Sequence, residues 1–286
     1  MISGRPKYEL KPYTDLTQVD DTELQDLDFK KAEAEGVKLK TNYPAFVKKG
    51  DVGVLIIHGF TGSPMEMQPL ADYLNEQGYS TYLVRMAGHG SKPENLNLST
   101  YVDWYESARY GYFLLKRNCK KVYVAGLSMG GLTALSVAGL NGADGVILMA
   151  PCIRMRSRAT DYSPVLSRFV KLLPKLEIGE WSRDKVDTYY DKWPVTGIYQ
   201  LLMYTRYVEG HMDRYKFPLL GFQFLNDGVV SGKATKKFFD DAPSKDKTYV
   251  EFPDKKMKNH ILVSDENIYR DEMFADIAKW ISERGE

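Results

Sequence analysis

The chain has 286 residues, 43% of them hydrophobic, and its 39 basic and 38 acidic side chains leave a formal net charge of +1. A chain of this length can bury one substantial core, which fits one domain carrying an insertion. The near-zero charge provides no excess of basic residues to attract nucleic acid or an anionic membrane over a distance. A small, near-neutral molecule is therefore the expected partner, and nucleic acid is not.

Cysteine content and apolar runs exclude several further classes of protein. The chain has only Cys119 and Cys152, too few for a disulfide framework and without the paired spacing of a zinc site. It has neither a cluster of His and Cys ligands nor a G-x-G-x-x-G turn opening a helix, so no metal and no organic cofactor is expected. No signal peptide is visible, and no run approaches the ~20 apolar residues of a membrane-spanning helix. We therefore expect a cytoplasmic protein without integral membrane association.

The first predicted elements are a charged helix and then a regular alternation of strands and helices. Residues 20–36 are helical in pattern, with Thr22 and Gln25 spaced as a capping box, and we expect residues 1–42 to form a solvated N-terminal extension. Continuous apolar runs predict buried strands at residues 52–57, 79–84, 121–125 and 145–149, with helices at residues 65–77, 101–116 and 129–140. This alternation predicts a mostly parallel sheet with helices on both faces.

The alternation stops after Pro151 and resumes near Pro218. Between them, residues 152–217 consist of short helical segments interrupted by prolines and glycines, which predicts an inserted, mainly helical cap subdomain. The later predicted elements are strands at residues 218–224 and 247–252 and helices at residues 233–240 and 268–283. The predicted core is therefore built from residues 43–151 and 218–286, with the cap inserted between them.

A G-x-S-x-G sequence stands at Gly126-Leu127-Ser128-Met129-Gly130. It directly follows a predicted strand and precedes a predicted helix rich in small residues, which is the context of a nucleophile elbow. In such a turn the serine backbone is strained and its neighbours must be small, because main chain passes where a side chain would lie. Ser128 is therefore the predicted nucleophile, at the N-terminus of a helix whose dipole favours developing negative charge.

The loop after the first predicted buried strand has the sequence His58-Gly59-Phe60-Thr61-Gly62. Acyl transfer passes through a tetrahedral oxyanion, which two preorganised N–H donors would stabilise by very roughly 3 kcal/mol each. We expect these donors to be the N–H groups of Met129 and Phe60, forming an oxyanion hole. For His58 we expect a structural role, in which the ring holds the loop while the backbone carries the chemistry.

A serine nucleophile needs a histidine base and a carboxylate that orients the histidine. Of the four histidines, His260 is the one that follows the final predicted strand, where the chain order Ser, Asp, His places the base. His89 and His211 come earlier in the chain. Asp227, which follows a predicted strand and precedes a tight turn, is the predicted acid, and Asp254 after the last predicted strand is the alternative.

Five motifs together resemble the bacterial carboxylesterase and monoacylglycerol lipase group of α/β-hydrolases. They are HGFTGSP at 58–64, RMAGHG at 85–90, GLSMGG at 126–131, NDGVV at 226–230 and NHIL at 259–262. The resemblance implies the α/β-hydrolase fold, a catalytic triad of Ser128, Asp227 and His260, and an oxyanion N–H on Phe60. Relatives usually have a proline where Ser231 stands. Their N-terminal segment is shorter, and the longer one here could pack on the sheet, cover part of the active-site mouth or mediate assembly.

The insert is rich in Leu, Met, Tyr and Trp and lies where this family carries a cap over the active site. Such side chains suit an apolar acyl group, although most of them must form the core of the subdomain itself. The expected activity is hydrolysis of small carboxylic esters with short to medium acyl chains, or of monoacylglycerol-like substrates, through an acyl-enzyme. A thioesterase, an amidase or a C–C hydrolase would use the same triad, and a non-catalytic ligand-binding homologue would share the fold.

Overall fold

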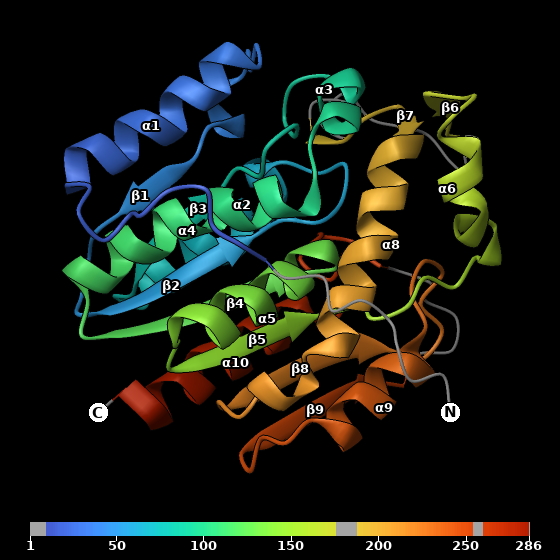
Figure 1. The fold of residues 1–286 in the computed structure, drawn as a ribbon. Helices are drawn as coiled ribbons and strands as arrows, with labels where there is room; N and C mark the ends of the chain where they lie inside the picture. Colours follow the sequence, from blue (N-terminus) through green and yellow to red (C-terminus); the bar gives the residue numbers. More distant parts are fainter. Residues whose placement is uncertain (1–9, 176–187, 254–259, 286) are drawn as a thin grey trace.

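The computed structural model describes residues 10–175, 188–253 and 260–285 of the chain. Its centre is a seven-stranded sheet in the order β1-β3-β2-β4-β5-β8-β9, in which β1 is antiparallel to β3 and the other neighbours are parallel (Figure 1). The strands are β1 (Ala45–Val47), β2 (Val52–Ile57), β3 (Ser80–Val84), β4 (Lys121–Leu127), β5 (Gly145–Met149), β8 (Leu219–Phe224) and β9 (Lys247–Phe252). The predicted mostly parallel sheet of an α/β-hydrolase fold is confirmed.

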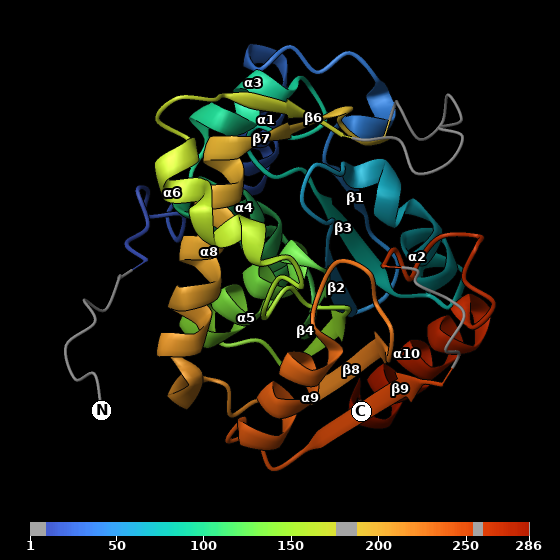
Figure 2. The same ribbon diagram turned by 90° about the vertical axis from the view of Figure 1, so that its right-hand side faces the viewer.

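Helices cover both faces of the sheet, as predicted. α2 and α10 pack together on one face, α4 and α5 lie on the other, and α8 packs against α4 and α5 (Figure 2). The helices of this part are α2 (Pro64–Glu76), α3 (Pro93–Leu98), α4 (Tyr101–Asn118), α5 (Met129–Asn141), α8 (Val195–Gly210), α9 (Gly232–Asp241) and α10 (Arg270–Gly285). Residues 129–138 of α5 are all buried, because this helix lies between the sheet and its neighbours α4 and α8.

The strand order places a binding position at the centre of the sheet. The chain moves outward from β2 to β3 on one side and from β4 through β5 and β8 to β9 on the other. In open α/β sheets, ligands bind outside the carboxyl ends of the strands at the point where the order reverses. This point lies between β2 and β4, whose following loops contain the predicted oxyanion donors and Ser128.

The start of the N-terminal helix differs from the prediction. α1 (Asp21–Ala34) is capped by Asp20, whose carboxylate accepts the Glu23 N–H at 2.9 Å, so the predicted capping box of Thr22 and Gln25 is wrong. Aspartate is as strong an N-cap as threonine, and Asp20 stands two residues earlier in the chain. Two short elements also escaped prediction, the three-residue edge strand β1 and the six-residue helix α3, because each is too short to show a periodic pattern.

The N-terminal extension is not simply solvated, and this expectation is wrong. Leu24, Asp28 and Ala32 recur every four residues, which places them on one face of α1, and all three are buried where α1 packs on α4. Asp28 accepts the Tyr82 hydroxyl at 2.7 Å, and burial raises the pKa of Asp28 to about 6. The charged residues on the other faces conceal this packing face in the sequence. Of the three roles left open, packing beside the sheet is the one that α1 fulfils.

The insert contains two short strands in addition to the expected helices. β6 (Leu172–Pro174) and β7 (Lys192–Pro194) form a separate antiparallel pair, preceded by a 3-10 turn (Arg158–Tyr162) and by α6 (Ser163–Leu166). α8, which follows β7, contributes Tyr204, Tyr207 and Val208 to the main hydrophobic core. Within the described ranges no helix combines the length and the apolar character needed to cross a membrane.

Candidate active site

Ser128 stands at a sharp turn between β4 and α5. Its backbone has a φ of 54° and a ψ of −115°, which is a strained conformation for a residue with a side chain. A Cβ added to Gly126 would lie 2.1 Å from the carbonyl oxygen of Gly130, and one added to Gly130 would lie 2.3 Å from that of Ile57. Both flanking positions therefore require glycine, and the turn has the geometry expected of a nucleophile elbow.

The structure brings the predicted nucleophile, base and acid into one chain of contacts. His260 Nε2 lies 2.8 Å from Ser128 Oγ, and His260 Nδ1 lies 2.8 Å from Asp227 Oδ2. The side chain of His260 is 14% exposed, and that of Asp227 is 0% exposed. These side chains come from the loops after β4 and β8 and from the segment before α10. His260 is 132 positions from Ser128 and 33 positions from Asp227 in the chain, yet the three meet at one edge of the sheet.

Backbone donors and His260 hold Asp227 in its ionised form. The second carboxylate oxygen, Oδ1, accepts the N–H groups of Val229 at 2.7 Å and Val230 at 3.0 Å. Burial by itself would raise the pKa of Asp227, but the adjacent His260 and these backbone donors bring it below its ordinary value. Asp227 is therefore a carboxylate at neutral pH and can accept a hydrogen bond from the His260 ring.

A series of hydrogen-bonded side chains behind Asp227 fixes the orientation of its carboxylate. The sequence analysis did not predict this series. Gln223 on β8 donates from Nε2 to Asp227 Oδ2 at 3.0 Å, and its Oε1 accepts the Thr235 hydroxyl of α9 at 3.1 Å. Gln223 and Thr235 are both fully buried. A buried amide with partners on both sides cannot rotate freely, so Gln223 fixes the carboxylate oxygen that faces His260.

Replacing Gln223 with methionine, which keeps much of the shape without the amide, is expected to lower kcat for ester hydrolysis about tenfold with little change in KM. The carboxylate would keep its backbone donors and lose only one orienting contact, so the loss stays well below the roughly 10⁴-fold cost of removing an acid from such a triad. Steady-state kinetics on a p-nitrophenyl ester measures it. Thr235→Val, which removes only the contact to Gln223 Oε1, should lower kcat less than Gln223→Met does. An equal or larger loss of kcat in Thr235→Val would contradict the role given to Gln223.

The other three histidines have structural partners. Each ring Nδ1 lies within hydrogen-bond distance of a backbone carbonyl, in the pairs His58 with Gly59, His89 with Ala87 and His211 with Tyr207. His58 Nε2 also accepts the Met86 N–H at 3.2 Å, and burial lowers the pKa of His58 to about 3. A neutral His58 therefore ties the loop after β2 to the loop after β3, in agreement with its expected structural role.

The two residues predicted to provide the oxyanion donors, Phe60 and Met129, belong to segments that adjoin Ser128. Met129 is the first residue of α5, where N–H groups lack partners within the helix, and it directly follows the serine. Phe60 lies in the loop after β2, and a Cβ added to the preceding Gly59 would lie 3.5 Å from Ser128 Cβ. The loop of residues 58–62, here called the oxyanion loop, therefore runs directly beside the nucleophile.

Glu66 is a residue of this site that the sequence analysis missed. It lies in the first turn of α2, is buried, and accepts the Gly59 N–H at 2.5 Å, while its burial raises the pKa of Glu66. A signal was present, since Ser63-x-x-Glu66 has the spacing of a capping box. The Ser63 side chain makes no capping hydrogen bond, and Glu66 holds the oxyanion loop instead.

The departure from relatives at Ser231 has a structural explanation. The Ser231 N–H donates to the Arg154 carbonyl at 2.9 Å, and its side chain caps α9 by accepting the Ala234 N–H at 3.3 Å. A proline could form neither contact, because it has no N–H and no hydroxyl. Ser231 therefore links the turn containing Asp227 to Arg154 and to the start of α9. The alternative acid Asp254 lies outside the described residues.

In the parts of the chain that the structure describes, no group of three or more His, Cys, Asp or Glu side chains could hold a metal ion. Cys119 and Cys152 are both buried free thiols, and burial raises the pKa of Cys152 to about 12. A thiol with so high a pKa is a poor nucleophile at neutral pH. The groups that the described site brings together are a serine hydroxyl, an imidazole and a carboxylate.

Comparison with known proteins identifies the family. A protein-family model described as serine aminopeptidase, S33 (Hydrolase_4), matches residues 49–256 of the chain. This range includes the elbow and Asp227. The chain belongs to this family of α/β-hydrolases. A solved structure described under two metagenome-derived lipolytic enzymes, LipS and LipT, is 26% identical, covers 84% of this chain and 99% of its own, and has a TM-score of 0.73.

Two curated relatives have related names. A thermostable monoacylglycerol lipase of Bacillus sp. (strain H-257) is 31% identical over 188 residues, which cover 65% of this chain and 75% of the relative. A carboxylesterase of Bacillus subtilis (strain 168) is 27% identical over 215 residues, which cover 74% of this chain and 86% of the relative. The structure of a monoacylglycerol lipase from Paleococcus ferrophilus, 19% identical with a TM-score of 0.70, covers 85% of this chain and 98% of its own and shares the fold.

Proposed function

We propose that this chain hydrolyses carboxylic esters with short to medium acyl chains, or monoacylglycerol-like substrates, through an acyl-enzyme on Ser128. The observation that carries the proposal is the pair of 2.8 Å contacts that join Ser128 to His260 and His260 to Asp227 at a nucleophile elbow. The names of the two curated relatives, a monoacylglycerol lipase and a carboxylesterase, support an ester as the substrate.

Each side chain has a distinct role in the proposed reaction. His260 accepts the Ser128 proton at Nε2 as Oγ attacks the ester carbonyl, and it then gives that proton to the leaving alcohol. The Asp227 carboxylate accepts a hydrogen bond from the Nδ1–H of His260, which fixes the tautomer and stabilises the transient imidazolium while Asp227 stays ionised. The N–H groups of Phe60 and Met129 stabilise the oxyanion. Water then attacks the acyl-enzyme, with His260 again as the base, and releases the acid.

The panel of substrates that tests this proposal separates it from the alternatives. A series of p-nitrophenyl esters, a thioester, an anilide and a C–C hydrolase substrate should show the highest kcat/KM on an ester. The elbow and oxyanion hole serve any tetrahedral intermediate, so only the relative rates distinguish esterase, thioesterase, amidase and C–C hydrolase. Turnover of none of these compounds, with binding of an ester retained, would favour a non-catalytic ligand-binding homologue.

Acyl-chain preference should have a maximum. Each methylene buried by the cap contributes about 0.8 kcal/mol, so kcat/KM should rise severalfold per carbon until the pocket is full. Because a cap of this size encloses a limited volume, we expect the maximum at roughly four to ten carbons and poor turnover of a long-chain triglyceride. A p-nitrophenyl ester series measures the profile.

Variants of the insert test whether it lines the acyl site. Of the two aromatic residues that the sequence singles out, Trp181 lies outside the described residues, whereas the hydroxyl of Tyr189 hydrogen-bonds Glu66 beside the oxyanion loop. Tyr189→Ala and Trp181→Ala together should flatten or shift the profile. Tyr162→Ala is the matched control, since this tyrosine of the same insert is 72% exposed. A flat profile in both wild type and variant would contradict a cap that lines the acyl site.

A further inference from the structure

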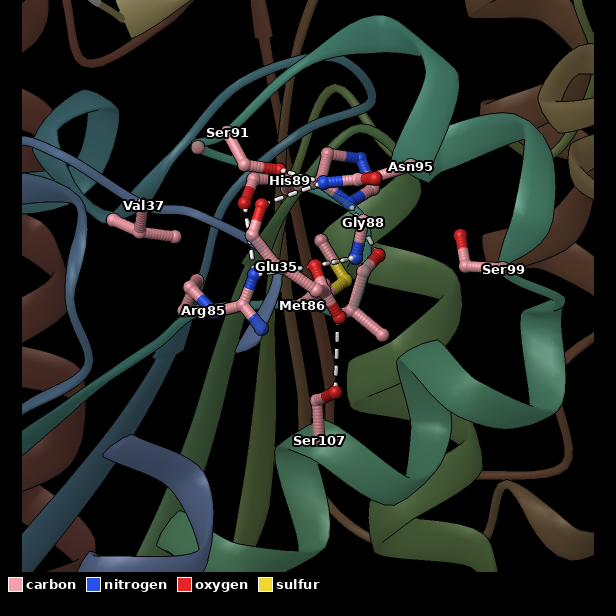
Figure 3. A network of polar contacts seen from close by, with 12 residues as sticks. Glu35, Val37, Arg85, Met86, Gly88, His89, Ser91, Asn95, Ser99 and Ser107 are labelled. Atoms are coloured by element: carbon pink, nitrogen blue, oxygen red, sulfur yellow. Dashed lines mark hydrogen bonds and ion pairs between the residues drawn. The ribbon is translucent and has the colours of Figure 1, made fainter. Parts of the chain in front are cut away.

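The N-terminal extension reaches the loop that follows β3. Glu35 is the residue after α1, and its Oε2 accepts both Arg85 Nη1 at 2.8 Å and the Gly88 N–H at 2.7 Å (Figure 3). The carbonyl of Glu35 accepts Asn95 Nδ2 at 2.7 Å. The side chain of Arg85 is 1% exposed and that of Glu35 is 26% exposed, so this ion pair is largely withdrawn from water. Glu35 therefore anchors the segment of residues 85–91, here called the bridging loop.

The bridging loop packs directly against the oxyanion loop. The Met86 N–H donates to His58 Nε2, and the His89 ring stands edge-on to the rings of His58 and Phe60, with centroids 5.0 and 6.1 Å apart. Gly88 has a φ of 76°, and a Cβ added there would lie 2.7 Å from Leu96 Cα. The bridging loop is thus tightly packed against its neighbours, and several hydrogen bonds fix its position.

Tyr190 of the insert connects the bridging loop to the oxyanion loop. Its hydroxyl donates to the Gly88 carbonyl at 2.6 Å and accepts the Ser91 N–H at 3.0 Å, while its own N–H donates to the Thr61 carbonyl at 3.2 Å. A continuous series of hydrogen bonds therefore runs from Glu35 through Gly88 and Tyr190 to Thr61. Thr61 is the residue after Phe60, whose N–H is one of the two proposed oxyanion donors.

Thr61 is strained, which makes the support around it necessary. Its φ of 64° lies in the left-handed region that a β-branched residue rarely adopts. Such a conformation persists only where surrounding contacts over-determine it. Here the neighbouring Gly59 is held by Glu66, the Thr61 carbonyl by Tyr190, and the Thr61 hydroxyl accepts Lys175 Nζ at 2.9 Å. If part of this support is removed, the backbone around Thr61 can relax. The N–H of the preceding residue, Phe60, can then turn away from the oxyanion.

We propose that Glu35 and Tyr190 are positioning residues that hold the oxyanion loop in its catalytic conformation, so that the N-terminal extension and the insert act on the reaction through the same series of contacts. The inference rests on the proposed ester hydrolysis. Neither side chain is required to touch the substrate. Their loss should therefore act on the transition state, in which the oxyanion exists, and leave ground-state binding nearly unchanged.

The test compares Glu35→Ala, Tyr190→Phe and the double variant on one p-nitrophenyl ester, with unfolding temperatures measured in parallel. Misplacing a donor should cost less than the roughly 10²–10³-fold loss that follows its removal, so we expect each single variant to lower kcat about tenfold with KM within about twofold. Because the two residues act through one series of contacts, the double variant should be little worse than either single variant. Glu35→Gln, which keeps an acceptor oxygen for Gly88, should recover most of the activity.

Glu33→Ala is the matched control, because Glu33 is exposed two residues earlier in the chain and should leave kcat unchanged. If Glu35→Ala fails to fold because Arg85 loses its buried partner, Tyr190→Phe decides alone. Wild-type kcat in Tyr190→Phe, or a loss confined to unfolding temperature or to KM, would overturn the proposal. Absence of ester turnover in the wild type would instead contradict the proposed function, so the two failures are distinguishable.

Discussion

Replacing Ser128 with alanine is expected to leave a folded protein whose kcat for ester hydrolysis is lower by about a millionfold. The alanine has no oxygen to form the acyl-enzyme, and only the oxyanion hole and substrate binding remain, which in such sites accelerate hydrolysis by about 10³–10⁴ over water. The elbow tolerates alanine, because the strain lies in the backbone and the neighbouring glycines are unchanged. Rates on a p-nitrophenyl ester and the far-UV circular dichroism of both proteins measure the two halves of this prediction.

Covalent labelling provides an independent check on the same residue. A fluorophosphonate should modify Ser128 in the wild type and should modify nothing in Ser128→Ala. Ser136→Ala is a matched control on the same helix, since Ser136 is buried in α5 and its hydroxyl donates to the Leu132 carbonyl. That variant should label like the wild type. Labelling that survives in Ser128→Ala, or ester turnover near the wild-type rate, would show that another residue is the nucleophile.

Removing the base should cost about as much as removing the nucleophile, and changing the acid should cost less. We expect His260→Ala to lower kcat about a millionfold and Asp227→Asn to lower it about 10⁴-fold, because an asparagine would favour the wrong imidazole tautomer while the geometry persists. The depressed pKa of Asp227 means that the carboxylate, and not the acid, does this work at neutral pH. Single-turnover kinetics with an activated ester separate the effect on acylation from any effect on product release.

Two further variants test whether these residues act as one unit. The double variant Ser128→Ala with His260→Ala should be no slower than either single variant, because either change already abolishes the same step. Asp254→Asn should have nearly the wild-type rate. If Asp254→Asn were as damaging as Asp227→Asn, the choice of acid would be wrong, and if the two losses in the double variant multiplied, Ser128 and His260 would not share one mechanism.

The sharp turn at Ser128 and the meeting of Ser128, Asp227 and His260 could be predicted, because the signals for them are local or ordered along the chain. Ser128 lies between a strand and a helix that are each visible as patterns, and the glycines beside it form a recognisable local motif. In the structure Gly126 is required by the nearby Gly130 carbonyl, and Gly130 by the distant Ile57 carbonyl. His260 follows from chain order alone, since it is the histidine after the last predicted strand. For Asp227 the sequence left Asp254 as an alternative. The structure places Asp227 Oδ2 2.8 Å from His260 Nδ1, whereas Asp254 lies outside the described residues, so the comparison of Asp254→Asn with Asp227→Asn remains the test.

The residues that support the site could not be predicted, because their contacts depend on how strands, helices and loops pack in three dimensions and not on a local pattern. Whether Gln223 faces Asp227 depends on the packing of β8 against α9, which places Thr235 beside its amide. Glu35 meets Arg85 fifty residues away, and nothing in the local pattern of α1 indicates which of its many charged side chains is withdrawn from water. Glu66 had a local signal, but a capping-box spacing predicts a contact within its own helix rather than one to Gly59.

The position of α8 determines which part of the insert could be exchanged between relatives. β5 and β8 are hydrogen-bonded neighbours that run parallel, and parallel neighbours must be joined by a crossover that returns the chain to the other end of the sheet. α8 provides this crossover on the α5 side, so residues from Val195 onward belong to the connection of the sheet itself. A chimera that replaces only residues 157–194 should keep the seven strands of the central sheet in register, while it exchanges β6, β7 and Tyr190 for the residues of its donor. A graft ending after α8 would instead have to rebuild the sheet connection.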